Sequence, residues 1–407
     1  MTRPPLKSLS DALADLLAHA VPLPDTDTVD TFEADGRVLC AAAVSPLKVP
    51  PNDNSAMDGY AVRRADITAA GVVLPVSQRI PAGSWGGPLA QGTAARIFTG
   101  APVPDGADAI VMQEDCEPLD DGRVRVNAVP APGQWVRRAG EDIALGAQVL
   151  AAGTRLTPAA LGLAASIGLG RLQVSRRPRV ALFSTGDELA MPGEVPPEQM
   201  KPGAIYNSNR FFLRTMLQRL GCEVTDLGIV PDRRDATIEA LRQASAAHDV
   251  ILTSGGVSVG EEDHIKPAVQ ALGELHLWQI AMKPGKPFAY GRVGGVHFMG
   301  LPGNPVSSFM TFAVLVRPFL LRLQGVQDVP PKAFTATAGF DWPRADKRRE
   351  FVRVRQGADG RLELFVNQSS GVLTSTAWGD GVVDNPPGTT IACGDSVRFL
   401  PFAELMS

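Results

Sequence analysis

Apolar residues follow two alternating patterns between residues 179 and 323 of the chain. Short continuous apolar runs, typical of buried strands, alternate with stretches in which apolar residues recur every three or four positions, typical of helices. The predicted strands are 180–183, 224–230, 250–253 and 275–280, with further strands around 288 and 298, and the predicted helices are 213–220, 237–247, 265–272 and 306–323. This alternation predicts an α/β domain with a mostly parallel sheet, helices on both faces, and ligands bound beyond the carboxyl ends of its strands.

The pattern changes on both sides of this domain. A helix over residues 10–20 is followed by short alternating runs and turn clusters, which indicate a β-rich domain. Thr157 and Pro158 begin another helix, which we expect to pair with the first. The predicted domains are an N-terminal helical and linker domain in two segments (1–45 and 141–177), the β-rich domain (46–140), the α/β domain (178–327) and a small C-terminal β-barrel-like domain (328–407).

Composition and charge narrow the class of protein. At 407 residues with 44% hydrophobic content, the chain is long enough for several cores. Its formal net charge of -4 argues against a general nucleic-acid binder, which needs an excess of Lys and Arg. The four scattered cysteines fit neither a disulfide framework nor a thiolate zinc site. Without a signal-peptide pattern or a run of roughly 20 apolar residues, we expect a cytoplasmic protein with no nucleic-acid or membrane partner.

A glycine-rich segment, SGGVSVG at 254–260, follows one predicted strand. Its glycines let backbone N–H groups approach a ligand closely, as an anion-binding nest requires. Glu261 stands where a Walker loop has its lysine, and the dinucleotide spacing G-x-G-x-x-G is missing. The segment therefore predicts a phosphate site of neither of these types. The candidate phosphate-binding residues are Ser254, Gly255, Gly256 and Ser258.

Carboxylates accompany two strand ends. Asp263 follows the glycine-rich segment and is a candidate Mg²⁺ ligand, because Mg²⁺ binds one or two carboxylates together with substrate phosphates. Glu261 and Glu262 are interpreted as a solvated charge run at a helix start, where acids suit the helix dipole. The segment STGDEL at 184–189 adds Asp187 and Glu188, and Asp187 is equally explained as a helix cap.

Two further strand ends carry lysine and proline. The segment KPGKP at 283–287 sets Lys283 and Lys286 on either side of a Pro-Gly turn, so both ammonium groups can converge on one oxyanion. The segment GLPGNP at 300–305 ends a strand and opens a long helix, which leaves free N–H donors at the helix start. Together the four segments predict one site with a phosphate half and an oxyanion half.

In this order the segments closely resemble those of the MoeA family of molybdopterin molybdenumtransferases, whose homologous domain also forms the C-terminal part of gephyrin. Three segments outside the α/β domain strengthen the resemblance: PPNDNSAMDGYAV (50–62), IFTGAPVP (97–104) and RAGEDI (138–143). The resemblance covers nearly the whole chain, and several long motifs in the family's order are far more specific than a single glycine loop.

The resemblance implies that the protein inserts molybdate into adenylylated molybdopterin and releases AMP with the help of Mg²⁺. It also implies an elongated homodimer in which the partner subunit completes the site. The positions that match catalytic residues are Asp58, Thr99, Asp142, Glu188, Asp263, Lys283 and Lys286. The positions that match substrate-binding residues are Ser254, Gly255, Gly256, Ser258, Pro302, Pro305, Arg353 and Ser370, and those that match metal ligands are Asp232 and Asp263. Asp58 and Asp142 are alternatively explained as turn caps or packing residues.

The chain departs from the family's pattern at two places. Gln279 stands where many relatives have Lys or Arg, so one cationic contact is absent. Asp232 is followed by Arg233 where relatives often carry a second acid, so Asp232 alone remains as a ligand candidate there. The expected partners are adenylylated molybdopterin, molybdate, a second copy of the chain, the upstream adenylyltransferase and recipient molybdoenzymes.

Three other functions compete with this interpretation. A molybdopterin adenylyltransferase shares the α/β domain, but such enzymes can be a single small domain and would not need residues 1–178 or 330–407. A non-catalytic scaffold, as in gephyrin, is disfavoured by the retained acids and lysines. A nicotinamide-nucleotide oxidoreductase is disfavoured by the missing dinucleotide fingerprint.

Overall fold

The sheet of the α/β domain is centred on strands that are buried on both faces. The computed structural model describes residues 6–256 and 264–406. The strands, in spatial order, are β16 (Glu223–Val230), β13 (Arg179–Thr185), β17 (Val250–Ser254), β21 (Val296–Leu301), β20 (Pro287–Val293) and β18 (Gly273–Gln279). The first four pair in parallel, and β20 is antiparallel to both of its neighbours. The predicted, mostly parallel sheet is confirmed, and every strand except β20 ends at the same edge.

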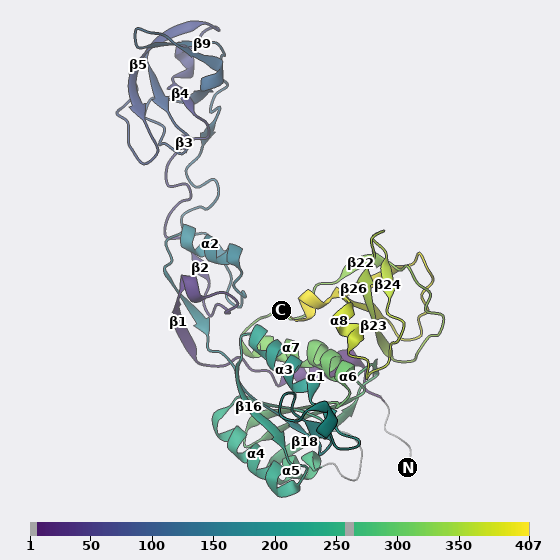
Figure 1. Cartoon of the computed structure of the whole chain (residues 1–407). Helices are drawn as coiled ribbons and strands as arrows, with labels where there is room; N and C mark the ends of the chain where they lie inside the picture. The colour runs from purple at the N-terminus through teal and green to yellow at the C-terminus, as the bar shows by residue number, and fades with distance from the viewer. Residues whose placement is uncertain (1–5, 257–263, 407) are drawn as a thin grey trace.

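Helices cover both faces of this sheet (Figure 1). Side chains alternate across β13, so Val180 and Leu182 join one core whereas Ala181 and Phe183 join the other. The helices of the first core are α1 (Leu9–Ala18), α3 (Ser208–Arg219), α6 (Pro305–Thr311), the π-helical segment η5 (Phe312–Val316) and α7 (Arg317–Leu323). Those of the second core are α4 (Arg234–Ala247) and α5 (Ile265–Leu272).

The chain changes direction across the sheet at β13. The connection through α3 leads from β13 to β16 on one side, and the connection through α4 then leads back past β13 to β17. In open α/β sheets, ligands bind where the strand order reverses in this way. The topology therefore places the ligand crevice at the carboxyl ends of β13 and β17.

The apolar helical run Pro305–Leu323 is long enough to cross a membrane by length and composition. However, 89% of its most apolar window is buried inside the protein, because α6, η5 and α7 fill the first core. It is thus placed as a core helix of the α/β domain.

The expected pairing of the two N-terminal helices is wrong. In α1, Ala12 and Leu16 are fully buried in the first core of the α/β domain, where α1 packs against α7. The second helix, α2 (Pro158–Ser166), begins at the predicted Thr157 cap but packs on η1 (Thr31–Glu33). The apolar stripe of α1 is needed to cover α7, whereas α2 closes a separate small core.

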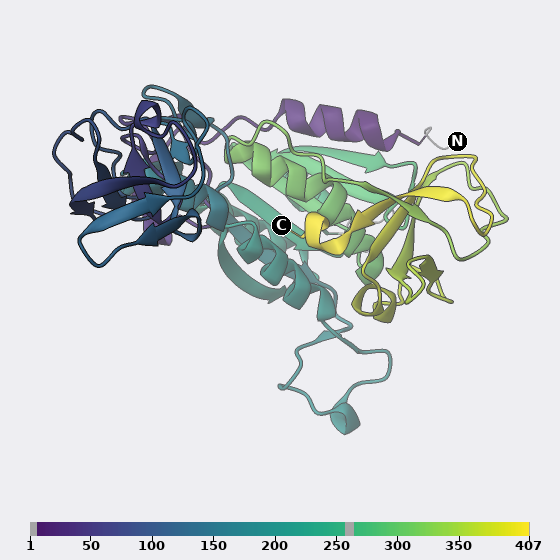
Figure 2. The same cartoon turned by 90° about the horizontal axis from the view of Figure 1, so that it is seen from above.

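That small core belongs to the two-segment N-terminal unit. Its strands are β1 (Thr26–Asp30), which pairs with β12 (Arg171–Ser175), and β2 (Ala43–Val44), which pairs with β11 (Gln148–Leu150). Both pairs join the outgoing segment of the chain to the returning one. The β-rich domain, inserted between these segments, lies at one end of the molecule and away from the α/β domain (Figures 1 and 2).

The β-rich domain contains one six-stranded sheet and a short antiparallel pair formed by its first and last strands. The sheet strands, in spatial order, are β7 (Ala109–Met112), β4 (Gly59–Val62), β6 (Ala94–Ile97), β5 (Val72–Ile80), β9 (Arg123–Val126) and β8 (Cys116–Pro118), and the pair is β3 (Asn54–Ser55) with β10 (Val136–Arg137). The two faces of the sheet carry separate apolar clusters, so this domain has a core of its own.

The C-terminal unit is a small β domain whose sheet also includes one strand from the α/β domain. Its elements are β22 (Phe334–Thr337), β23 (Arg349–Gln356), β24 (Leu362–Leu364), α8 (Thr374–Trp378), β25 (Gly381–Asn385), β26 (Ser396–Pro401) and α9 (Phe402–Leu405). A bridge between Ala338 and Leu362 brings the end of β22 back to β24, so the sheet closes on itself. The strand from the α/β domain is β19 (Met282–Lys283), which pairs with β23 and contains the first lysine of the KPGKP segment.

Candidate functional site

A cavity of about 680 Å³ lies at the carboxyl edge of the sheet, where the topology predicts a ligand crevice. Residues from all four predicted strand-end segments line it. The predicted site residues among its lining are Glu188, Asp232, Ser254, Gly255, Gly256, Pro302 and Pro305. Their convergence from segments up to 117 positions apart (188 to 305) follows from the common direction of β13, β17 and β21.

The start of the glycine-rich segment has a backbone that only glycine fits. Gly255 and Gly256 have φ angles of 94° and 64°, in the left-handed region. A Cβ on Gly255 would lie 2.7 Å from the carbonyl oxygen of Thr185, and one on Gly256 would lie 2.6 Å from Cγ1 of Ile265. The turn therefore brings bare backbone to the cavity wall. The predicted residues Ser258 and Asp263 lie outside the described residues.

Acidic residues also line the cavity. Glu188 and Asp232 both line the cavity, and Asp187 Oδ1 accepts a 3.4 Å hydrogen bond from the Asp232 N–H. Asp187 thus joins two strand-end loops, and among the described helices none begins beside it, so its interpretation as a helix cap is wrong. Glu188, Asp232 and the glycine turn therefore line one cavity, and Mg²⁺ binds one or two carboxylates together with substrate phosphates.

The two predicted lysines differ in their surroundings. Lys283 Nζ lies 3.0 Å from Glu350 Oε1, at the start of β23, and 3.7 Å from Asp346 Oδ2, just before that strand. The side chain of Lys286 is half-buried and has no hydrogen-bond or ion-pair partner among the residues the structure describes. The next residue, Pro287, lines the cavity. Lys286 is consequently the cation of this pair that remains available to an anion.

Arg353 is a buried cation close to the same cavity. Its side chain is 2% exposed, and it donates to Ser375 Oγ at 3.2 Å and to the carbonyl oxygens of Phe351 and Ser369 at 3.1 and 3.3 Å. Burial lowers the pKa of Arg353 to about 10, so the guanidinium stays charged at neutral pH. No carboxylate is paired with it in the described part of the chain.

Ser370 lies between Ser369, whose carbonyl accepts from Arg353, and Gly371, which lines the cavity. Its carbonyl oxygen accepts a 2.9 Å hydrogen bond from the Val306 N–H at the start of α6, and Gly371 lines the cavity. Pro305 has no N–H and Val306 donates to Ser370, so the free donors expected at this helix start are partly used. The segment 369–371 therefore carries the C-terminal domain to the cavity rim.

Lys283, Lys286, Arg353 and Ser370 are not themselves among the lining residues, although Pro287 and Gly371 are. Three further predicted site residues lie outside the α/β and C-terminal domains. Asp58 Oδ1 accepts from both the N–H and Oγ1 of Thr99, each at 2.8 Å, in the β-rich domain. These bonds lower the pKa of Asp58. Asp142 is exposed, and its N–H donates to the Val49 carbonyl between the domains. The cavity lining within the described chain includes none of the three.

Gln279, which stands where many relatives have Lys or Arg, takes part in a backbone hydrogen bond to the N-terminal segment. The Gln279 carbonyl accepts a 2.8 Å hydrogen bond from the Lys7 N–H, which attaches the N-terminal segment to the edge of the sheet.

Sequence reasoning missed the amides that line the cavity at the start of α3. Asn207 caps α3, because its Oδ1 accepts from the Arg210 N–H, and Asn209 Nδ2 donates to Ser254 Oγ at 2.8 Å and to the Gly303 carbonyl at 2.7 Å. The signal was present, since asparagine is a preferred helix cap. The apolar periodicity that defined this helix begins only at Leu213, so its polar first turn was overlooked.

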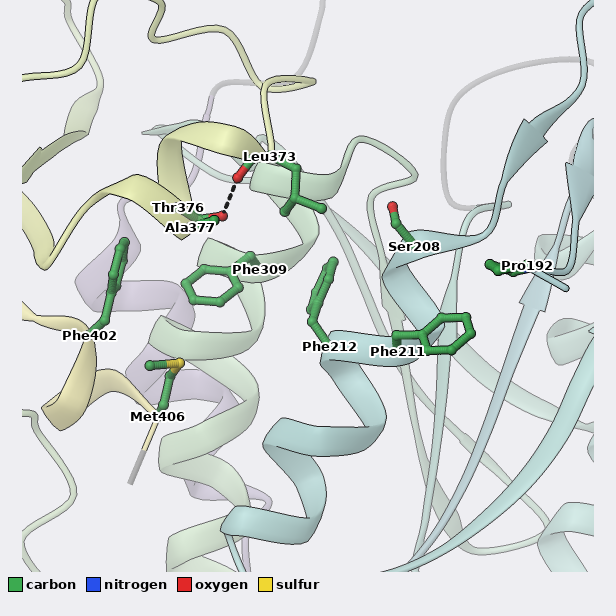
Figure 3. Close-up of a pocket in the computed structure, with 10 residues that line it drawn as sticks. All are labelled: Pro192, Ser208, Phe211, Phe212, Phe309, Leu373, Thr376, Ala377, Phe402 and Met406. Carbon is green, nitrogen blue, oxygen red and sulfur yellow. Dashed lines mark hydrogen bonds between the residues drawn. The ribbon is translucent and has the colours of Figure 1, made fainter. Parts of the chain in front are cut away.

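A second hollow, of about 580 Å³, has a different character (Figure 3). Phe212 and Phe309 pack edge to face in its wall with ring centroids 5.8 Å apart, and Phe309 packs against Phe402 at 5.3 Å. None of its lining residues is ionisable. It lacks the charges that bind phosphate or molybdate, so the polar cavity is the candidate site.

Comparisons with known proteins agree with this geometry. Residues 7–168 match the MoeA N-terminal region (domain I and II), residues 181–322 match a probable molybdopterin binding domain, and residues 335–402 match the MoeA C-terminal region (domain IV). The chain is 37% identical over 405 residues to the molybdopterin molybdenumtransferase of Haemophilus influenzae, with 96% of this chain and 97% of that protein covered.

Further similarities come from a second relative and a solved structure. The chain is 39% identical over 386 residues to molybdopterin molybdenumtransferase 2 of Mycobacterium tuberculosis, with 91% of this chain and 94% of that protein covered. The crystal structure of the molybdopterin biosynthesis moeA protein from Pyrococcus horikoshii superposes with a TM-score of 0.84 at 29% identity, covering 98% of this chain and 100% of that one.

Proposed function

The chain belongs to the MoeA family of molybdopterin molybdenumtransferases, and we propose that it inserts molybdate into adenylylated molybdopterin with release of AMP. It is a transferase of molybdenum cofactor biosynthesis, acting on molybdopterin and molybdate. The observation that carries the proposal is a polar cavity with two cations close to its lining: Lys286 precedes the lining residue Pro287, and Arg353 donates to Ser369, two residues before the lining residue Gly371.

The cavity suits the nucleotide half of the substrate. The left-handed turn at Gly255 and Gly256 brings bare backbone to the cavity wall, with the Gly255 N–H held by the Leu301 carbonyl, and Ser254 adds a hydroxyl. Backbone N–H groups in such turns bind anions without a positively charged side chain. We assign the phosphoanhydride of the substrate to this part of the cavity.

The basic residues beside it suit the oxyanion. A buried guanidinium without a carboxylate partner is costly unless an anion pairs with it, and Arg353 lies under the loop that carries Gly371 to the cavity. Lys286 and the preceding Lys283 approach from β19 and its loop. We assign molybdate to this half, with Lys286 and Arg353 as its principal cations and Lys283 acting from an acid-paired position.

The described residues fit a magnesium ion at the phosphate half. Glu188 and Asp232 supply oxygen donors on the cavity wall, and Mg²⁺ prefers one or two carboxylates completed by substrate phosphates and water. No group of three His, Cys, Asp or Glu is clustered in residues 6–256 and 264–406, so a cage made only of protein ligands is not expected there. Asp232, together with Asp263, would hold the ion, whose charge would offset the charge of the departing phosphate.

Replacing either proposed ligand is expected to raise the Mg²⁺ requirement. For Asp232→Asn and Asp263→Asn, the Mg²⁺ concentration that gives half-maximal AMP release should rise roughly tenfold, with little change in Tm, because one charged oxygen donor is lost. Glu261→Gln is the matched control, since this neighbouring acid is interpreted as solvated. If Asp263→Asn has unchanged turnover at every Mg²⁺ concentration, Asp263 is removed from the metal site.

We also propose that the protein acts in the cytoplasm as a homodimer with shared sites. Asp58, Thr99 and Asp142 match catalytic positions of the family, but none is among the lining residues of the cavity of their own chain. The β-rich domain, which contains Asp58 and Thr99, lies away from the α/β domain (Figure 1). A second copy would bring them to the cavity across the dimer. The cavity would then be closed by acidic and hydroxyl groups that one chain alone does not provide.

The proposed reaction is tested by supplying the purified protein with adenylylated molybdopterin, Mg²⁺ and molybdate. AMP release that depends on molybdate and yields active cofactor is the expected result. Formation of adenylylated molybdopterin from ATP and molybdopterin would instead identify an adenylyltransferase. Absence of both reactions would favour a scaffold.

A further inference from the structure

Buried polar atoms without hydrogen-bond partners gather around the cavity. Eight such side-chain atoms occur among the described residues, and six belong to strand ends and helices that border the cavity. The six are Ser184 Oγ, Thr185 Oγ1, Asn207 Nδ2, Thr253 Oγ1, Ser308 Oγ and Thr311 Oγ1. Buried polar groups in native proteins are almost always paired with protein groups or water, so the unpaired atoms that line the cavity are the ones a bound ligand can satisfy.

Two of these six residues, Thr185 and Asn207, line the cavity itself. Their side chains are only 4% and 3% exposed. Asn207 is fixed by the cap of α3, because its Oδ1 accepts a 3.3 Å hydrogen bond from the Arg210 N–H. This bond leaves the amide nitrogen of Asn207 as a donor in a set orientation but without an acceptor.

The neighbouring Asn209 shows what a purely structural amide looks like in the same turn. Its Nδ2 donates to both Ser254 Oγ and the Gly303 carbonyl, so its two N–H donors are used in joining α3 to β17 and to the loop before α6. Asn207 makes no comparable bond. The difference separates a residue that holds the cavity wall from one that is available to a ligand.

Thr185 lies against the glycine turn. A Cβ on Gly256 would lie 2.8 Å from Thr185 Oγ1, and one on Gly255 would lie 2.7 Å from the Thr185 carbonyl oxygen. The hydroxyl is therefore next to the backbone assigned to phosphate. The Thr185 hydroxyl can donate one hydrogen bond and can also accept, whereas the amide nitrogen of Asn207 can only donate. Both residues call for a ligand rich in acceptor oxygens.

We propose that Asn207 Nδ2 and Thr185 Oγ1 donate hydrogen bonds to phosphate oxygens of the nucleotide substrate, an inference that rests on the proposed function. The N-terminus of the twelve-residue helix α3 lies at the same place and favours a negative charge. Both residues act as substrate-binding groups that recognise phosphate and not the nucleoside. Without substrate, neither Asn207 Nδ2 nor Thr185 Oγ1 makes a hydrogen bond that stabilises the fold.

Two conservative variants separate binding from folding. Thr185→Val removes the hydroxyl and keeps the shape, and Asn207→Ser keeps a good helix cap while removing the amide donor. Titration calorimetry with AMP and with adenosine, together with Tm, is measured for each. Thr157→Ser, a cap change at α2 away from the cavity, is the control. We expect each cavity variant to bind AMP about tenfold more weakly, with adenosine affinity unchanged and with the Tm of Thr185→Val equal to or above that of the wild type.

The outcomes distinguish this inference from the function on which it rests. If the wild type binds AMP and releases it from adenylylated molybdopterin, but both variants bind AMP as the wild type does, the inference fails and the function stands. Equal weakening of AMP and adenosine also overturns it, because the residues would then only shape the cavity. If the wild type binds no AMP, both the inference and the proposed nucleotide site fail.

Discussion

Replacing Arg353 by methionine is expected to lower molybdate-dependent cofactor formation by on the order of a thousandfold. The methionine keeps most of the side-chain stem but removes a buried guanidinium that has no carboxylate partner. An arrangement of preoriented donors in a site shielded from water contributes strongly to anion binding, because it requires no reorganisation when the anion arrives.

The stability of the Arg353 variant should change far less than its activity. Three hydrogen bonds to Ser375, Phe351 and Ser369 are lost, but the cost of burying an unpaired charge disappears with them. Arg353→Lys is the informative companion, since it retains the charge without the planar fork and should recover part of the activity. If Arg353→Met binds and uses molybdate normally, the guanidinium serves only to link β23 to the loop 369–371.

Replacing Lys286 by methionine is expected to lower molybdate turnover by about a hundredfold, chiefly through a higher KM for molybdate. Its ammonium group has no partner among the described residues, so removing it leaves no protein group unsatisfied. The Tm of this variant should therefore remain close to that of the wild type. Steady-state kinetics with molybdate as the varied substrate, combined with thermal unfolding, measure both quantities.

Lys283→Met is the matched control for this prediction. Lys283 pairs with Glu350, whose side chain is 4% exposed, and Glu350 also accepts a 2.8 Å hydrogen bond from Trp342 Nε1. Loss of Lys283 leaves a buried carboxylate with one partner fewer, which should cost about 1 kcal/mol of stability, because the exposed part of Lys283 weakens the pair. Identical kinetic and thermal profiles for the two lysine variants would contradict the assignment of Lys286 as the free cation.

The sequence predicts the α/β domain well, because its signals are local. Buried strands such as 250–254 and helices with apolar residues every three or four positions are visible within ten to fifteen positions, and Thr157 predicts the start of α2. The direction of parallel strands then brings the four loops to one edge. The turn at Gly255 and Gly256 is predictable from residue type, because glycine readily adopts the left-handed φ angles that both residues have.

Other features depend on contacts between distant segments and could not be predicted. The acids that pair with Lys283 lie more than sixty positions further along the chain (346 and 350), on or just before β23, which pairs with β19. The packing of α1 against α7 could not be predicted, because the apolar face of a helix does not reveal which apolar surface will cover it. The separation of Asp58 and Thr99 from the cavity likewise follows from domain arrangement, which no motif encodes.

The division of the site into a phosphate half and an oxyanion half is tested most directly by crystals of the protein grown with AMP and molybdate. Anomalous scattering at the molybdenum absorption edge locates the metal without reference to any assumed pose. We predict one molybdenum peak between Lys286 and Arg353, with the AMP phosphate beside Gly255 and Gly256. A molybdenum peak inside the glycine turn, with AMP bound at the lysine loop or nowhere in the cavity, would contradict the account.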